Sequence, residues 1–140
     1  MENILAPDRI AMIAVDNNHL VGLIGAIPQY GTTGWELHPL VVDEKYRNRG
    51  IGRSLEAALV QEVKKAGGIV IYLGTDDERF QTSLSQEDLF DDPYTKIKNI
   101  KNLNNHPYSF YEKLGFIICG VIPDANGVGK PDIIMAKRIF

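Results

Sequence analysis

The chain has 140 residues, of which 44% are hydrophobic, and this suits one domain of ordinary size with a substantial core. Its formal net charge of −3 argues against a nucleic-acid-binding protein, and no apolar run approaches the roughly 18 residues that a membrane span requires. The opening MENILAPDRIAM lacks the basic start and long apolar run of a signal peptide, so we expect a cytoplasmic protein.

The first 42 residues predict three consecutive strands. Arg9 to Val15 is apolar and β-branched, Asp16-Asn17-Asn18 supplies turn chemistry, and His19 to Ile27 returns as a hairpin strand that Pro28 ends. After a loop at Gly31–Gly34, the run Trp35 to Val42 predicts the third strand.

Pro39 lies inside that third strand. Because proline cannot donate to a strand ladder, we expect the strand to be at an edge or bulged there. Strand alternation places Glu36, His38 and Leu40 on one face.

The middle of the chain changes from strand to helical spacing. A helix is predicted from Ile51 to about Ala66, and Gly67-Gly68 ends it. The apolar run Ile69 to Leu73 then predicts a strand covered on both faces. The apolar positions of the helix are Ile51, Leu55, Ala58, Leu59 and Val63.

The last third predicts two helices and two strands. Pro107 to Leu114 has proline at a first-turn position and Gly115 just past its end, which are the two ordinary helix boundary signals. The other predicted elements are a helix within Pro93 to Leu103, a strand from Phe116 to Ile122, a turn at Asp124–Gly129 and a strand from Asp132 to Ala136 or beyond. The order indicates an α/β protein, with a mixed sheet in a single layer and helices on its faces.

The one cysteine, Cys119, lies in the apolar run FIICGVI, which predicts a buried and unreactive thiol. One cysteine excludes a disulfide or a cysteine zinc site within the chain, and we expect no metal.

Charge is concentrated between Asp76 and Asp92, where seven acidic residues stand against one arginine. This segment is either a solvated acidic loop or a loop that attracts a cationic ligand.

Residues 46 to 52 read YRNRGIG and connect a predicted strand to a predicted helix. Free amides at a helix N-terminus, two glycines and nearby arginines would together suit a pyrophosphate, although a tight basic turn is the alternative. The turn lacks the Gly-Lys-Ser/Thr ending of a Walker loop and the third glycine of the dinucleotide fingerprint, which argues against a nucleotide-binding domain.

Arg47-x-x-Gly50-x-Gly52 after an apolar strand, together with FYEKLGF downstream, resembles the two signatures of the GNAT superfamily of N-acetyltransferases. GAIPQYGTTGWELHPLVV, IYLGTDDE, TSLSQEDL, HPYSFYEKLGF and KPDIIMAKR are together similar to aminoglycoside 6'-N-acetyltransferases. The resemblance implies that residues 1–140 form one GNAT domain, with a mixed, mainly antiparallel sheet flanked by helices, acetyl-CoA as donor and a homodimeric state. The donor-binding residues it implies are Leu40, Val42, Arg47, Asn48, Arg49, Gly50, Ile51, Gly52, Arg53, Asn104 and Tyr111.

Transfer from a thioester to an amine needs a neutral amine, a polarised carbonyl and a protonated leaving thiolate. The resemblance implies that Glu36 is the base, that the Leu40 amide polarises the carbonyl and that Tyr111 protonates the thiolate. His38 is a proton relay, a substrate contact or a residue packed beside Pro39, and Tyr108 is the rival to Tyr111. Beside Asn104, either Asn102 or Asn105 could instead cap the helix that follows.

Aminoglycosides are polycationic, so an acidic acceptor site is expected. Ligands commonly gather at the carboxyl ends of strands, which favours Asp76 and Asp77 after the central strand. The full set of substrate candidates is Tyr30, Glu36, Asp76, Asp77 and Asp132.

The chain departs from the family in that Pro7-Asp8-Arg9 already opens the hairpin. The resemblance implies that one strand and a helix pair are missing before it, so we expect an N-terminally shortened fold with exposed apolar sheet surface and self-association. Two other functions remain open: an acetyltransferase for a polyamine, peptide or protein amine, and a non-catalytic coenzyme-A-binding module.

Overall fold

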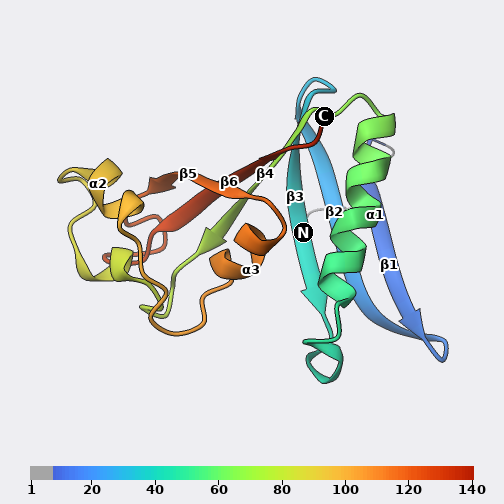
Figure 1. Ribbon diagram of the computed structural model, residues 1–140, viewed down its shortest axis with the longest axis horizontal. Helices are drawn as coiled ribbons and strands as arrows, with labels where there is room; N and C mark the ends of the chain where they lie inside the picture. Colours follow the sequence, from blue (N-terminus) through green and yellow to red (C-terminus); the bar gives the residue numbers. More distant parts are fainter. Residues whose placement is uncertain (1–7) are drawn as a thin grey trace. The chain divides into compact units, whose positions relative to one another are not determined.

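Within residues 8–140, six strands in the order β1-β2-β3-β4-β6-β5 form the mixed sheet that the sequence predicts for an α/β protein. The computed structural model describes residues 8–140, so the expected absence of a signal peptide rests largely on residues outside this range. The chain divides into two compact units. Figure 1 colours the ribbon in chain order, from blue near the N-terminus to red at the C-terminus. Unit 1 contains the residues up to Tyr72 and Arg138–Phe140, and unit 2 contains Leu73–Lys137.

Unit 1 begins with the predicted hairpin of β1 (Ile10–Asp16) and β2 (His19–Tyr30). Asn17 and Asn18 have φ angles of 48° and 66°, the pair of left-handed residues that a tight two-residue hairpin turn requires. The prediction that Pro28 ends β2 is wrong. The strand continues to Tyr30, because the ladder is already irregular between Pro28 and Tyr30 and does not need the missing proline N–H.

The third strand, β3 (Gly34–Val42), carries the bulge that Pro39 predicts. Ile24 lies opposite Leu40 and Ala26 lies opposite Leu37, so one β2 residue faces two residues of β3. The prediction that Leu40 shares a face with Glu36 is therefore wrong, because the extra residue in the bulge shifts the alternation between them. The first half of β3 also pairs in parallel with β4 (Val70–Asp76), over Gly34–Glu36.

A 3₁₀ turn, η1 (Glu44–Tyr46), leads into α1 (Ile51–Lys65), which packs on β1, β2 and β3. Gly22 allows this approach, since a Cβ there would lie 2.9 Å from Cδ1 of Leu55. Gly67 ends the helix as predicted, with a φ of 96°. The helix buries Leu55, Leu59 and Val63 as expected and also Glu56, which its pattern assigns to the polar face.

Unit 2 contains the 3₁₀ turn η2 (Ser83–Gln86), α2 (Pro93–Lys98), α3 (Tyr108–Lys113), β5 (Ile117–Ile122) and most of β6 (Asp132–Arg138). The helix predicted within Pro93 to Leu103 is present as Pro93–Lys98, and Asn102 beyond it pairs with Thr82 in an isolated bridge. The core of this unit includes Leu73, Leu84, Phe116, Ile133 and Met135.

The prediction of a buried Cys119 is wrong, since its side chain is exposed. Cys119 lies on β5, which is the last strand in the sheet and pairs with β6 on one side. Residues 117 and 119 alternate onto the same face of this strand, and that face is exposed to solvent. No helix within residues 8–140 has the length and apolar character to cross a membrane.

Candidate active site

The candidate residues fall into two sets, one in each unit. Unit 1 holds Tyr30 and the positions from Glu36 to Arg53, and unit 2 holds Asp76, Asp77, Asn104, Tyr111 and Asp132. Each set is described within its own unit.

The YRNRGIG turn leaves the start of α1 accessible. Gly50 is the N-cap residue, with a φ of 81° that favours glycine, and a Cβ there would meet no described atom within 4 Å. Among residues 8–140 no side chain caps this helix by a hydrogen bond, and the amides of its first turn have no acceptor within the helix itself. A 15-residue helix adds partial positive charge at this end, and the geometry therefore fits a pyrophosphate group.

The arginines of the turn are exposed. Arg47 donates from Nε to the carbonyl oxygen of Val42 at 3.4 Å, which ties the turn to the end of β3. The guanidinium of Arg49 lies 5.0 Å from the ring centroid of Tyr46. Arginine forks suit phosphate oxygens, so the turn combines backbone donors with full positive charges.

The second half of β3 presents its backbone on the edge away from β2. The amide of Asp43 donates to Val21 of β2 at 2.8 Å, so alternation along β3 turns the amides of Leu40 and Val42 away from β2. Within unit 1, β4 pairs with β3 over Gly34–Glu36, before these two amides. The amides of Leu40 and Val42 are thus directed toward that edge.

Glu36 lies in a row of side chains across three strands. Its register partners are Ile27 on β2 and Tyr72 on β4, and its Oε1 accepts a hydrogen bond from Nε2 of Gln29 at 3.1 Å. The pKa of the Tyr72 phenol is raised, first by burial and then by the charge of Glu36. The exposed ring of Tyr30 meets Tyr72 edge-on at 5.9 Å, so unit 1 brings a carboxylate and two tyrosines together.

Sequence reasoning missed Tyr72. The signal that could have found it is the apolar run IVIYL, which is typical of a central parallel strand. A parallel partner for the strand containing Glu36 places Tyr72 opposite the carboxylate, but the register needed to know this is not local.

In unit 2, α3 carries both candidate tyrosines. Tyr108 is 4% exposed, and its pKa is raised by burial first, then by the charge of Glu112. Tyr111 is half-buried between the rings of Phe110 and Phe116, and burial raises the pKa of its phenol. Tyr111 is therefore the better placed of the two to present a neutral hydroxyl to a ligand.

The three asparagines before α3 also differ. The carboxamide of Asn102 accepts from the amide of His106 and donates to the His106 carbonyl and the Ser109 hydroxyl, so its polar atoms are used inside the unit. Asn105 has a φ of 51°, which asparagine tolerates in a turn. Asn104 has an exposed side chain on a held backbone, because Gln81 Nε2 donates to its carbonyl oxygen at 2.9 Å.

The acidic candidates have unlike surroundings. Asp77 is fully buried, and its carboxylate accepts from the amides of Gln81 and Thr82 and from the Thr82 hydroxyl. Asp76 is exposed and accepts from the Asn126 side chain. The carboxylate of Asp132 lies over Gly74 of β4, where an added Cβ would be 2.7 Å from both oxygens.

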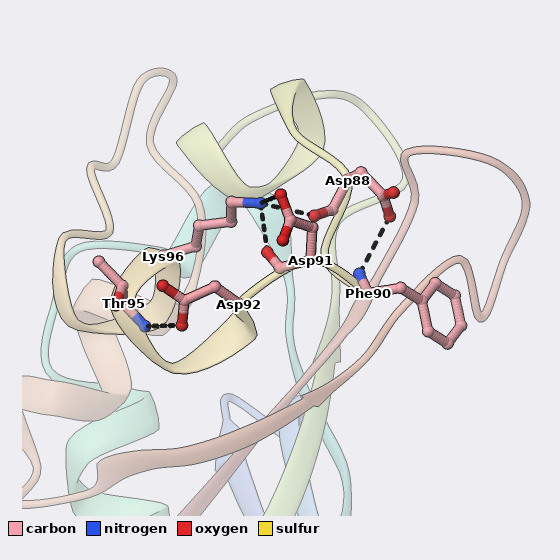
Figure 2. Close-up of polar contacts among 6 residues, drawn as sticks. All are labelled: Asp88, Phe90, Asp91, Asp92, Thr95 and Lys96. Carbon is pink, nitrogen blue, oxygen red and sulfur yellow. Dashed lines mark hydrogen bonds and ion pairs between the residues drawn. The ribbon is translucent and has the colours of Figure 1, made fainter.

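The acidic loop before α2 is folded on itself (Figure 2). Lys96 of α2 donates from Nζ to the carbonyl oxygens of Asp88 and Asp91 and lies 3.9 Å from the Asp91 carboxylate. Asp92 caps the helix by accepting from the amide of Thr95 at 3.4 Å. Part of the predicted negative charge is thus offset by a lysine of the same unit. Within residues 8–140 no cluster of His, Cys, Asp and Glu could hold a metal ion.

The sequence profile of the acetyltransferase (GNAT) family matches residues 2–83. The chain belongs to the GNAT acetyltransferase family. Three solved structures of this family are similar over 98% of the chain. An aminoglycoside 6'-N-acetyltransferase complexed with coenzyme A is 58% identical, with a TM-score of 0.96 and 76% of its own length covered.

The same enzyme type from Enterococcus faecium is also 58% identical, with a TM-score of 0.95 and 76% of that chain covered. Aminoglycoside 6'-acetyltransferase type Ii is 49% identical, with a TM-score of 0.75 and 73% coverage. About a quarter of each of these relatives therefore has no counterpart in this GNAT chain. No curated protein matches the sequence.

Proposed function

We propose that residues 1–140 act as one GNAT domain that transfers an acetyl group from acetyl-CoA to the 6'-amine of an aminoglycoside. The observation that carries this proposal is the 58% identity, over 98% of the chain, to an aminoglycoside 6'-N-acetyltransferase complexed with coenzyme A. The residues that match the family, 2–83, include the turn and the β3 edge described above.

The donor half of the site belongs to unit 1. The first-turn amides of α1 and the side chains of Arg47, Arg49 and Arg53 would hold the pyrophosphate, because Gly50 leaves the approach open. The outward amides of Leu40 and Val42 would hold the extended part of the donor along β3. Asn104 of unit 2 is proposed as a further polar contact.

Bound acetyl-CoA supplies the acetyl thioester. The Leu40 amide is the proposed donor to the thioester carbonyl, where negative charge develops during attack. Glu36 is the proposed base, acting on the amine through water, and Gln29 orients its carboxylate. Tyr111 is the proposed acid for the departing sulfur, since burial keeps its phenol protonated to a higher pH than usual. His38 is exposed on the same strand and is proposed as a relay.

For the acceptor we propose two groups of contacts. Tyr30 is exposed and would stack on a sugar ring, with Glu36 and Tyr72 beside it. Asp76 and Asp132 are the proposed carboxylates for the ammonium groups. Asp77 leaves the proposed substrate set, because its oxygens already accept three hydrogen bonds inside unit 2.

The direct test measures acetyl transfer to two aminoglycosides that differ only in an amine or a hydroxyl at the 6' position. We expect turnover with the amine alone. The Glu36→Gln variant should lose at least about 10²-fold in kcat while binding acetyl-CoA as tightly as the parent chain by calorimetry. Equal turnover in Glu36→Gln would reject the base assignment.

A panel of polyamines, peptides and lysine-containing proteins tests the alternatives. Transfer to one of these, with none to the aminoglycoside, would assign a different acceptor. Tight acetyl-CoA binding without transfer to any amine would make the chain a coenzyme-A-binding module.

We also propose that the chain forms a homodimer. Ile13, Leu23 and Val41 lie opposite one another across β1, β2 and β3, on the face away from α1, and Ile13 and Val41 are 62% and 55% exposed. Light scattering after gel filtration should give twice the monomer mass, and Ile13→Glu should restore the monomer. The use of acetyl-CoA supports the cytoplasm as the proposed compartment.

A further inference from the structure

His106 is a buried titratable residue for which the proposed reaction has no use. Its side chain is 1% exposed and lies between α3 and the end of β4, both within unit 2. Its Nε2 is 2.9 Å from the carbonyl oxygen of Asp76, and its Nδ1 accepts the amide of Tyr108 at 3.0 Å.

These two hydrogen bonds determine which ring nitrogen of His106 carries a proton. A carbonyl oxygen only accepts and an amide only donates, so Nε2 carries the proton and Nδ1 carries none. Protonation at Nδ1 would break the hydrogen bond with Tyr108. His106 therefore acts as a neutral connector with one donor and one acceptor, directed at two different elements.

His106 connects the last residue of β4 to the first residue of α3. Asp76 ends β4, and Tyr108 begins α3 and packs its ring 5.5 Å from the imidazole. The backbone of His106 is also held, because Asn102 accepts its amide at 2.7 Å and donates to its carbonyl at 2.9 Å. Both the ring and the backbone of His106 are thus determined by the surrounding chain.

A second anchor lies beside the first. Asp77 follows the last residue of β4 and accepts hydrogen bonds from the amides of Gln81 and Thr82. The Gln81 carbonyl in turn accepts hydrogen bonds from the amides of Leu103 and Asn104. The segment that leads into α3 is therefore attached to the end of β4 at both its start and its end. α3 itself has six residues, too short to hold its position by its own hydrogen bonds.

We propose that His106 is a positioning residue that fixes the start of α3 against the end of β4 and thereby sets the place of the Tyr111 hydroxyl. The proposal rests on the proposed function, in which Tyr111 protonates the leaving sulfur. Tyr111 lies on the same short helix, with its amide bonded to the Pro107 carbonyl at 3.2 Å, so a shift of the helix start moves Tyr111 with it.

Two substitutions separate the two contacts of the ring. His106→Gln keeps a donor near the position of Nε2 and loses the acceptor for Tyr108. His106→Asn keeps a short acceptor for Tyr108 and loses the donor to Asp76. If the connection to β4 positions Tyr111, His106→Asn should lower kcat by about 10²-fold, and His106→Gln should stay within about tenfold of the parent. If His106 only caps α3, His106→Gln should lower kcat more than His106→Asn does, and this result would overturn the proposal.

A double-variant cycle with Tyr111→Phe tests whether the effect passes through the phenol. When Tyr111 is already phenylalanine, adding His106→Asn should lower kcat by less than about threefold, because the misplaced group is absent. If His106→Asn lowers kcat equally in both backgrounds, the loss comes from general damage and the proposal fails. In each background, adding His106→Asn should leave the KM for acetyl-CoA near the value of that background.

Hydrogen exchange gives a readout that does not need turnover. The amides of residues 109–113 should lose protection in His106→Asn and retain it in His106→Gln. If no amine is acetylated by the parent chain, the proposed function fails, and the exchange pattern still decides whether His106 anchors α3. Equal protection in both variants would reject the anchor.

Discussion

Gly25 of β2 faces His38 of β3 so closely that a Cβ at position 25 would lie 2.7 Å from the His38 carbonyl oxygen. This approach occurs at the bulge, where one residue of β2 opposes two residues of β3. The bulge is followed by the Leu40 amide, which turns away from β2. Gly25 therefore contributes to the shape of the β3 edge that is proposed to bind the donor.

Gly25→Ala should accordingly destabilise the chain by about 1–3 kcal/mol, because the added methyl group meets a backbone oxygen that cannot rotate away. It should also raise the KM for acetyl-CoA. Urea unfolding and steady-state kinetics measure the two effects. Gly120→Ala on β5 is the matched control, since a Cβ there meets no described atom within 4 Å. Equal stability of the two variants would show that the bulge adjusts without cost.

Asp77→Asn should destabilise the fold by about 1–3 kcal/mol. An amide in place of the buried carboxylate directs an NH₂ group at one of three donors, the Gln81 amide, the Thr82 amide or the Thr82 hydroxyl. Asp88→Asn is the control, because Asp88 is exposed and accepts one turn amide, that of Phe90, as an asparagine also can. If Asp77→Asn instead raised only the KM for the aminoglycoside, Asp77 would return to the proposed substrate set.

Local sequence signals predicted most of the elements, because strand alternation, turn residues and helix boundary glycines act over a few neighbours. Asn17 and Asn18 turn the hairpin, and Gly67 and Gly115 end helices with φ angles of 96° and 97°. The predictions failed at Pro28 and Cys119. Pro28 stays in β2 because it pairs with Trp35 of β3, and Cys119 is exposed because β5 is the last strand in the sheet.

The site shows the same division. The turn at Gly50 and the bulge near Pro39 were predictable, since each depends on residues beside it. The opposition of Glu36 and Tyr72 depends on a parallel register, and the burial of Asp77 and His106 depends on how unit 2 closes around them. An acidic residue after a strand has the same sequence context whether it faces solvent or supports a loop.

Tyr111 should affect stability in alkaline solution. Burial raises the pKa of its phenol above the ordinary value of 10.0, so the folded state holds the proton more tightly than the unfolded state. Its contribution is fully present below pH 10 and is lost as the pH rises through the folded pKa. The free energy of unfolding should thus fall less steeply above about pH 10 in Tyr111→Phe than in the parent chain. Urea titrations between about pH 8 and pH 11 check this, and Tyr94→Phe on an exposed ring should leave the profile unchanged.

Lys96→Met should loosen the acidic loop without altering the reaction. The substitution keeps an unbranched side chain, one atom shorter, and removes the donor to the carbonyls of Asp88 and Asp91. Amide exchange in residues 88–92 should accelerate, whereas kcat and the KM for acetyl-CoA should stay within about twofold, as expected for a change away from the chemistry. A fall in the KM for the aminoglycoside would indicate that the uncovered carboxylates attract the polycation.

The reason for glycine at position 50 can be separated into two causes. Its φ of 81° disfavours alanine, and the open space at its Cβ position would allow a ligand to approach the backbone. Gly50→Asn removes most of the conformational penalty, since asparagine tolerates the left-handed region, but it still places a side chain in that space. We therefore expect both Gly50→Ala and Gly50→Asn to raise the KM for acetyl-CoA by about tenfold or more, with Gly50→Ala alone losing about 1–2 kcal/mol of stability. Normal acetyl-CoA binding by Gly50→Asn would mean that the residue serves the turn alone, and the pyrophosphate would have to bind elsewhere.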